Sequence, residues 1–158
     1  AIIYARFWVT YKERRPKHEN ECRDILLSEL KSRLSPHGVE CAPEAQYVNN
    51  NRADIRASFS NRFAAPMEFK CDWNEHLWTG LRDQLINRYS IEKNASLHGI
   101  YVVLWFGKHS RGKIPKTLNG SPTPQTPKQI EDYLLSLLNP EEKQRILVRV
   151  INLEWAGA

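Results

Sequence analysis

The sequence is poor in cysteine and has no long apolar run, and each shortage excludes a class of protein. Three cysteines, Cys22, Cys41 and Cys71, stand among 158 residues, and no two of them form a C-x-x-C pair. An odd number of widely spaced cysteines argues against a disulfide framework or a zinc knuckle and favours a reducing, cytoplasmic compartment. No stretch approaches the roughly 20 apolar residues of a membrane-spanning helix.

Several catalytic patterns are missing as well. The sequence has no glycine-rich phosphate loop, no H-E-x-x-H zinc motif and no G-x-S-x-G nucleophile elbow. The five histidines are scattered without the spacing of metal ligands, and only His76 lies within the polar stretch 52–89. Cys71 would need a histidine partner to act as a nucleophile, so we expect it to fill buried space instead.

What is present is an ordinary globular composition with an excess of basic residues. Apolar residues make up 41% of the chain and charged residues 26%, and this length can form one domain with a substantial core. The net charge is +5, from 23 Lys and Arg against 18 Asp and Glu, which is compatible with a polyanionic partner. The chain opens without Met on an apolar run, so we expect a domain excised from a longer protein or a processed N-terminus.

Helical periodicity is clear in residues 19–34, and it separates two acids at the start of that segment. At about 100° per residue, the apolar side chains from Cys22 to Leu34 share one face. Glu19 falls on that face, whereas Glu21 points almost opposite. An acid in the first turn of a helix is stabilised by the helix dipole. The dipole does not explain why Glu19 lies on the apolar face. We therefore expect Glu19, rather than Glu21, to be functional.

Strand-like alternation follows in residues 53–59 and 67–71, and we expect a loop between them. Asp54 belongs to the polar face of the first strand. Glu68 and Lys70 share one face of the second strand, because successive side chains of a strand point to opposite faces. The two strands can therefore bring two carboxylates and a lysine together.

A helix is expected over residues 72–89, where apolar side chains recur with helical spacing. Gln84 and Arg88 lie along its apolar stripe. Polar groups on a buried face need partners. A functional site beneath this helix would supply them, and so would a water-filled edge.

The complete pattern predicts an α/β domain with a mixed sheet flanked by helices. Its core spans residues 19–107 and ends in an apolar run that suits a strand covered on both faces. Residues 108–125 form a basic loop, either a flap over nucleic acid or, as we prefer, a plain surface loop. Residues 126–158 contain a helix, with Thr126 as its N-cap, and a final strand.

The polar residues of the two strands suit hydrolysis of a phosphodiester bond. Mg²⁺ or Mn²⁺ prefers carboxylates, carbonyl oxygens and water as ligands, and Asp54 and Glu68 would supply two carboxylates. Lys70 lies roughly 6.5–7 Å from Glu68 along the strand, within reach of the attacking water or the phosphate. The carbonyl of Phe69, between them, is a further candidate ligand.

Together, the motifs ADI (53–55), EFK (68–70) and QLINRY (84–89), after the acidic helix start HENE, resemble the PD-(D/E)xK nuclease superfamily. This superfamily has the restriction-endonuclease-like fold. The resemblance implies that Asp54 and Glu68 are metal ligands and that Lys70 is the catalytic lysine. It also implies that Glu19 is the acid that a helix contributes to the metal site.

The resemblance extends to the second helix. Gln84 and Tyr89 resemble the Q-x(3–4)-Y signature of the exonuclease-like branch, with a spacing one residue longer than the commonest form. Arg52-Ala53 stands where the superfamily usually has a proline before the first acid. From these positions we expect Gln84 to act in catalysis, and Arg52, Arg88 and Tyr89 to contact nucleic acid.

Three functions remain open at this point. The first is a Mg²⁺-dependent endonuclease acting on DNA, and nucleases of this kind often work as homodimers. The second is a nucleic-acid-binding domain without catalysis. The third is a protein-interaction domain of a larger, defence-type protein, in which the EFK triplet is a surface ion pair. Intact Asp54, Glu68 and Lys70 favour the first.

Overall fold

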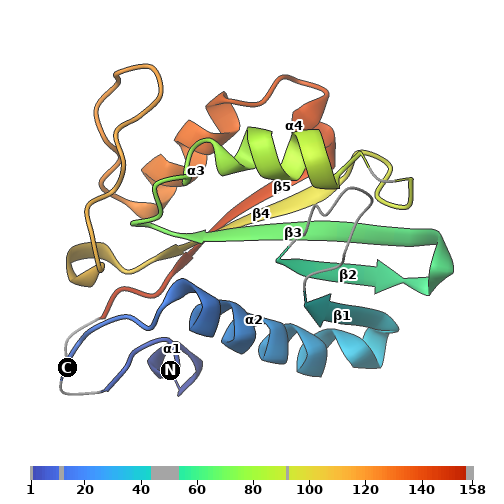
Figure 1. The fold of residues 1–158 in the computed structure, drawn as a ribbon, viewed down its shortest axis with the longest axis horizontal. Helices are drawn as coiled ribbons and strands as arrows, with labels where there is room; N and C mark the ends of the chain where they lie inside the picture. The colour runs from blue at the N-terminus through green and yellow to red at the C-terminus, as the bar shows by residue number, and fades with distance from the viewer. Residues whose placement is uncertain (1, 11–12, 44–53, 92, 156–158) are drawn as a thin grey trace.

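A computed structural model describes residues 2–10, 13–43, 54–91 and 93–155, which form an α/β arrangement around a five-stranded mixed sheet (Figure 1). The strands lie side by side in chain order. The pairs β1–β2 and β2–β3 are antiparallel, and the pairs β3–β4 and β4–β5 are parallel. The strands are β1 (Val39–Pro43), β2 (Ile55–Phe59), β3 (Phe63–Cys71), β4 (Gly99–Trp105) and β5 (Ile146–Asn152).

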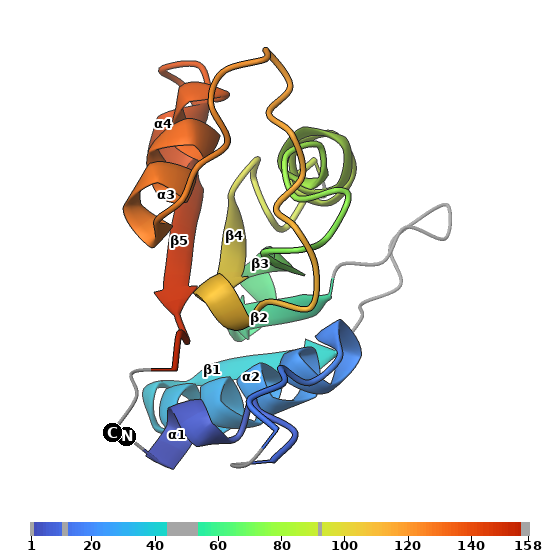
Figure 2. The ribbon, with the colours of Figure 1, turned by 90° about the vertical axis from the view of Figure 1, so that its left-hand side faces the viewer.

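Helices cover both faces of this sheet (Figure 2). Helix α2 (Glu19–Leu34) packs on one face, and helices η3 (Leu81–Tyr89) and α3 (Pro127–Ser136) pack on the other. The general class predicted from the sequence, a mixed sheet flanked by helices, is therefore confirmed. The remaining short elements are α1 (Ile2–Ala5), η1 (Ser35–His37), η2 (Ser60–Arg62), η4 (Gly107–His109) and α4 (Glu142–Arg145).

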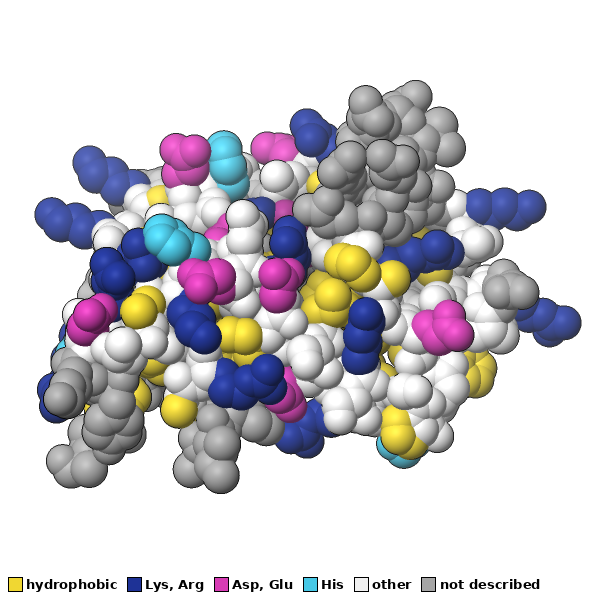
Figure 3. Space-filling model, turned by 60° about the horizontal axis from the view of Figure 1, so that its bottom comes forward, with side chains coloured by type: hydrophobic (Ala, Val, Ile, Leu, Met, Phe, Trp, Pro, Cys, Tyr) yellow, Lys and Arg dark blue, Asp and Glu magenta, His cyan; other side chains and the backbone are white. Residues whose placement is uncertain are grey.

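The outer surface on the α2 side is polar and mixed in charge (Figure 3). Exposed basic residues of α2 such as Lys31 and Arg33 stand among acidic ones such as Asp24. Interspersed charges of both signs are typical of a solvated helix face. No helix of the described residues is both long and apolar enough to cross a membrane.

Strand β3 is the centre of the fold and is buried on both faces from Ala64 to Cys71. Phe69 packs into the core beneath α2, together with its neighbours two residues away along the strand. Glu68 and Lys70 point to the opposite face, where their β4 partners Tyr101 and Val103 belong to the core under η3. Alternation in a strand thus forces two charged side chains into a covered face.

The loop expected at NRFAAP (61–66) is wrong from Phe63 onward, because β3 already begins there. Pro66 is part of the strand and pairs with Arg56 of β2. Proline cannot donate a ladder hydrogen bond, but β4 joins β3 only from Met67 onward. Pro66 therefore lies where β3 has a neighbour on one side only, and the strand tolerates it.

The helix expected over residues 72–89 is also shorter than predicted, since η3 begins at Leu81. Residues 72–79 form turns instead, because Asp72 and Asn74 use their side chains to bond other segments. The helix η3 is wound in the wide π manner, and Ser90 N donates to Leu85 O at 2.9 Å. Such windings are rare and occur frequently at functional sites.

The C-terminal part follows the sequence pattern closely. Helix α3 begins after Thr126, whose side chain accepts a hydrogen bond from Gln129 N. Within residues 108–125 the only regular element is the end of η4. This loop is tied down, since Trp78 Nε1 donates to Pro115 O at 2.9 Å and Leu118 N donates to Tyr133 Oη at 2.8 Å.

Candidate active site

The site forms where β2 stops accompanying β3. The first residue of β2, Ile55, pairs with Met67, so the amides of Phe69 and Cys71 have no β2 partner. Two carboxylates replace the missing strand. Asp54 Oδ2 accepts from Phe69 N at 3.1 Å, and Glu19 Oε2 accepts from Cys71 N at 2.8 Å. Buried backbone donors need acceptors, and here acids from two other segments supply them.

Glu19 is held at this edge by a second partner. Asn74 Nδ2 donates to both of its carboxylate oxygens, at 2.8 and 2.9 Å. Glu21 is exposed and accepts instead from His18 N at 3.0 Å, as part of a capping box. The expectation that Glu19 points inward and Glu21 outward is therefore confirmed, although the function of Glu19 stays a prediction.

Glu68 and Lys70 form a buried ion pair on the other face of β3. They are 2% and 6% exposed, and Lys70 Nζ donates to Glu68 Oε1. The second carboxylate oxygen, Glu68 Oε2, is buried and has no partner among the described residues. A buried carboxylate oxygen without a donor is costly.

The electrostatics of the cluster are dominated by its acids. Burial, followed by the negative charge of Asp54, raises the pKa of Glu68 to about 8 against the opposing effect of Lys70. Burial likewise raises the pKa of Asp54. Burial works to lower the pKa of Lys70, but the attraction of Glu68 outweighs it, and the pKa rises. Lys70 thus faces three acids, counting Glu19, and Arg23 adds a second positive charge that acts on Asp54.

The donor set fits a hard cation in part. No group of three or more His, Cys, Asp or Glu side chains in the described ranges is arranged to hold a metal ion as it stands. Both oxygens of Glu19 and one of Glu68 are engaged in hydrogen bonds. Glu68 Oε2 stays available, as does the Asp54 carboxylate, which bonds Phe69 N through one oxygen. The two acids suited to Mg²⁺ or Mn²⁺ are thus only partly occupied.

Helix η3 places its first turn over Lys70. A side chain added at Gly80 would lie 2.8 Å from Tyr101 Oη and 3.1 Å from both Gln84 Oε1 and Lys70 Cε. Gln84 is therefore brought beside the lysine, and its Oε1 is buried without a partner among the described residues. The inward placement expected for Gln84 is confirmed.

Two other sequence-predicted residues lie elsewhere. Arg88 is exposed, so the expectation that it faces inward is wrong; the buried positions of η3 are Leu81, Leu85 and Tyr89. Their spacing of four follows from the wide winding of the helix. Tyr89 belongs to the apolar core under η3, and Arg52 lies outside the described residues.

The other candidates behave as the simpler interpretations predicted. Cys71 is fully buried, and burial raises the pKa of its thiol far above the ordinary range, which suits a filler and not a nucleophile. His76 is exposed.

Sequence reasoning missed three residues around the site. Tyr101 is fully buried against it, donating from Oη to Leu77 O at 2.9 Å, and nothing in the apolar run of β4 sets it apart. Asn74 orients Glu19. Asp72 accepts from Phe106 N at 2.8 Å and from Ser110 Oγ at 2.6 Å. For Asp72, the sequence did contain a signal: it is an acid placed directly after a buried strand.

A family described as "Domain of unknown function (DUF8371)" matches residues 2–108, well over half of the chain. The chain belongs to this family. The DUF8371 match contains α2, η3, the first four strands and every candidate site residue. No curated protein and no solved structure matches the chain.

Proposed function

We propose that this DUF8371 domain is a divalent-metal-dependent endonuclease of the PD-(D/E)xK type, with a restriction-endonuclease-like fold, that hydrolyses phosphodiester bonds in DNA. The observation that carries the proposal is the convergence of Asp54, Glu19, Glu68 and Lys70 on one end of β3. These residues come from three separate segments. Asp54 and Glu19 both raise the pKa of Glu68, and a bound cation would favour its carboxylate form.

The ligands for Mg²⁺ or Mn²⁺ would be the carboxylates of Asp54 and Glu68, with Glu19 and the carbonyl of Phe69 as further donors. A strand residue presents its N–H and C=O to the same side, and the Phe69 amide bonds Asp54. Its carbonyl therefore faces the same edge as the acid. When bound, the cation supplies a charge sink for the phosphate and lowers the pKa of an attacking water.

The protein's own groups have separate tasks. The Lys70 ammonium is held in place by Glu68 and can donate to a phosphate oxygen or to the attacking water. Gln84 Oε1 is a buried acceptor beside Lys70 that can orient that water. Tyr101 keeps its proton, because burial and then the charge of Glu68 raise its pKa well above the ordinary value. It therefore adds no further negative charge.

Nicking of supercoiled plasmid in Mg²⁺ or Mn²⁺ tests the proposal. Asp54→Asn keeps an oxygen for the Phe69 amide but removes the charge, so the fold should persist while activity falls by about 10²-fold or more. Lys70→Ala should have a similar effect on nicking. Lys128→Ala is the matched control, since that lysine is exposed on α3 and pairs with Asp132. Equal nicking by wild type and Lys70→Ala would rule the site out.

A second candidate function rests on the same contacts. Asp54 and Glu19 both act as acceptors for the free edge of β3, which a nucleic-acid-binding domain without catalysis could also use to hold its fold. Salt-dependent DNA binding without cleavage would favour this function. The EFK triplet is not the surface ion pair that the protein-interaction hypothesis assumed, because Glu68 and Lys70 are buried.

A further inference from the structure

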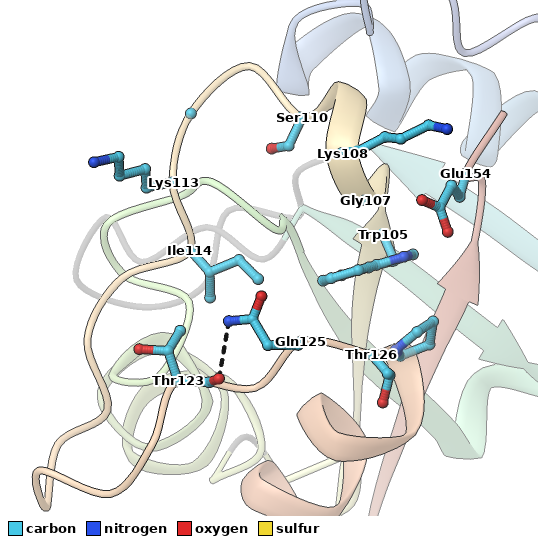
Figure 4. A pocket seen from close by; sticks show the side chains of 12 residues that line it. Trp105, Gly107, Lys108, Ser110, Lys113, Ile114, Thr123, Gln125, Thr126 and Glu154 are labelled. Atoms are coloured by element: carbon cyan, nitrogen blue, oxygen red, sulfur yellow. Dashed lines mark hydrogen bonds between the residues drawn. The ribbon is translucent and has the colours of Figure 1, made fainter.

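A cavity with polar and apolar walls lies at the carboxyl end of β4, the strand next to the one that carries Glu68 and Lys70. It measures about 600 Å³ and opens between the end of β4, the loop after it and the start of α3 (Figure 4). It thus sits at the carboxyl ends of parallel strands, where α/β sheets characteristically bind ligands. Its volume is within the range of about 300–1,000 Å³ typical of small-molecule sites.

The cavity wall contains a buried donor without an acceptor. Trp105 lines the cavity and is 6% exposed, and its Nε1 has no partner among the described residues. Buried indole N–H groups usually find a partner. Trp78 illustrates this, since its Nε1 donates to Pro115 O at 2.9 Å. The unpaired Trp105 donor points to a ligand that supplies an acceptor.

The cavity also offers two other kinds of polar group. Gln125 points into it, and the Glu154 carboxylate stands at the end where the Trp105 nitrogen lies (Figure 4). An indole N–H, an amide and a carboxylate together can bond the mixed donors and acceptors of a nucleobase edge. Ile114, on the opposite wall, adds an apolar surface for a flat ring.

Two lysines line the cavity, whose wall also holds the Glu154 carboxylate. Lys108 and Lys113 both line the cavity, and no described acid pairs with either lysine. The N-terminus of α3, a helix of 10 residues, opens on the same space at Thr126 and Pro127. Lysines and a helix N-terminus both favour a phosphate.

Two links join this cavity to the candidate active site. Ser110 lines the cavity and donates to Asp72 at 2.6 Å, two residues beyond Lys70. Val103 of β4 is the strand partner of Lys70, and Trp105 follows two residues later on the same face. The cavity therefore lies at the carboxyl end of the strand next to the one that carries Lys70.

We propose that this cavity binds one nucleotide of the DNA strand next to the cleaved bond, with its base edge against Trp105, Gln125 and Glu154 and its phosphate near Lys108 and Lys113. The assignment to DNA rests on the proposed nuclease function. Nucleotide binding itself needs no metal and no cleavage. An experiment can therefore contradict nucleotide binding in the cavity without contradicting the nuclease function, and the reverse.

The test is ¹H–¹⁵N NMR of the five tryptophan indoles, in EDTA, with each of the four deoxynucleoside 5′-monophosphates as probe. The Trp105 signal, assigned with Trp105→Phe, should shift on titration, because its N–H gains an acceptor. The Trp78 signal should stay in place, since its N–H is already bonded. A motionless Trp105 signal, or an equal shift with inorganic phosphate alone, overturns the proposal.

Variants at the rim test the geometry without endangering the fold. Gln125 and Lys113 are exposed, and replacing either by Ala should raise the dissociation constant by about tenfold, as expected for one lost polar contact. A short single-stranded oligodeoxynucleotide should bind more tightly than the mononucleotides. Equal affinity for the oligodeoxynucleotide and the mononucleotides would mean that the cavity binds free nucleotides, and it would overturn the proposal that it binds a nucleotide of the DNA strand. If the wild-type protein does not nick plasmid but its Trp105 signal still shifts with nucleotide, only the nuclease function is contradicted.

Discussion

At the scale of single residues, Glu68 should make stability depend on pH. Its pKa is raised from 4.5 to about 8, so between these values the folded state holds a proton that the unfolded state has released. Stability from this group is complete below about pH 4.5 and is lost as the pH rises toward 8. We expect the free-energy advantage of wild type over Glu68→Gln to fall by at most about 1.4 kcal/mol per pH unit in that window.

Urea unfolding of both proteins across this range measures the effect. The glutamine is the suitable control because it retains the shape of Glu68 and an oxygen for Lys70, but it does not titrate. Parallel stability curves for the two proteins would show that Glu68 is not the titrating group. Metal binding should release a proton below pH 8, since a cation requires the carboxylate form.

Two variants of Glu19 can separate the effect of its charge on stability from the effect of its hydrogen bond. Glu19→Ala leaves the buried Cys71 amide without its acceptor and should cost about 1–3 kcal/mol of stability. Glu19→Gln loses the same charge at the helix start but keeps an acceptor oxygen, so we expect less than half that loss. Urea midpoints and hydrogen exchange of the Cys71 amide are the measurements. Equal losses in the two variants would mean that the carboxylate acts through its charge and not as an acceptor.

The sequence was informative about which residues carry charge into the site, and much less about what they bond. Alternation put Glu68 and Lys70 on one face, and helical phase put Glu19 inward, because both patterns are local. The bonds from Asn74 to Glu19 and from the Cys71 amide to Glu19 span 55 and 52 residues. Such partners depend on where β2 ends relative to β3, which no local pattern encodes.

At the scale of elements, the close approach of η3 to β3 depends on Gly80. Its backbone is ordinary helical, so alanine would favour the helix itself. The new Cβ would nevertheless lie 2.8 Å from Tyr101 Oη, at the end of a rigid, fully buried ring. We expect Gly80→Ala to cost about 1–3 kcal/mol through overpacking and to reduce nicking by displacing Lys70 and Gln84.

Gly112→Ala is the control for Gly80→Ala, because its Cβ would meet only Trp73 Cβ, at 3.3 Å, in an exposed position. It should lose less stability than Gly80→Ala. Thermal unfolding and the plasmid assay follow the two effects. A Gly80→Ala protein with unchanged stability and activity would show that η3 can move away from β3 without consequence.

The same helix shows why the pattern over residues 72–89 was only half right. Apolar spacing was read as a regular α-helix, which put Arg88 on the buried stripe. The structure winds residues 81–89 more widely, so every fourth residue is buried and Arg88 is exposed. Residues 72–79 are not helical, because Asp72 accepts hydrogen bonds from Phe106 and Ser110. Both causes are tertiary contacts, which override local propensity.

At the scale of the whole molecule, the boundary of the family match does not coincide with a boundary of the fold. The match ends at residue 108, but β5 pairs with the full length of β4. Ile130 and Leu134 of α3 are fully buried in the same core as η3. Arg82 of η3 also donates to both carboxylate oxygens of Glu142, at 2.5 and 2.9 Å. The segment after 108 is therefore part of the same cooperative structure.

We accordingly expect a chain ending at Lys108 to fail to fold cooperatively. Removing β5 and α3 would leave β4 as an open, apolar edge strand and expose the core face beneath η3, which promotes association of unfolded chains. Circular dichroism during urea titration should show a sigmoidal transition for residues 1–158 and a broad or absent one for residues 1–108. Refolding of the truncated chain with a peptide of residues 109–158 would test whether the missing segment alone is responsible. A sharp transition in residues 1–108 alone would show that the part matched by the family is an independent domain, with α3 and β5 as an addition to it.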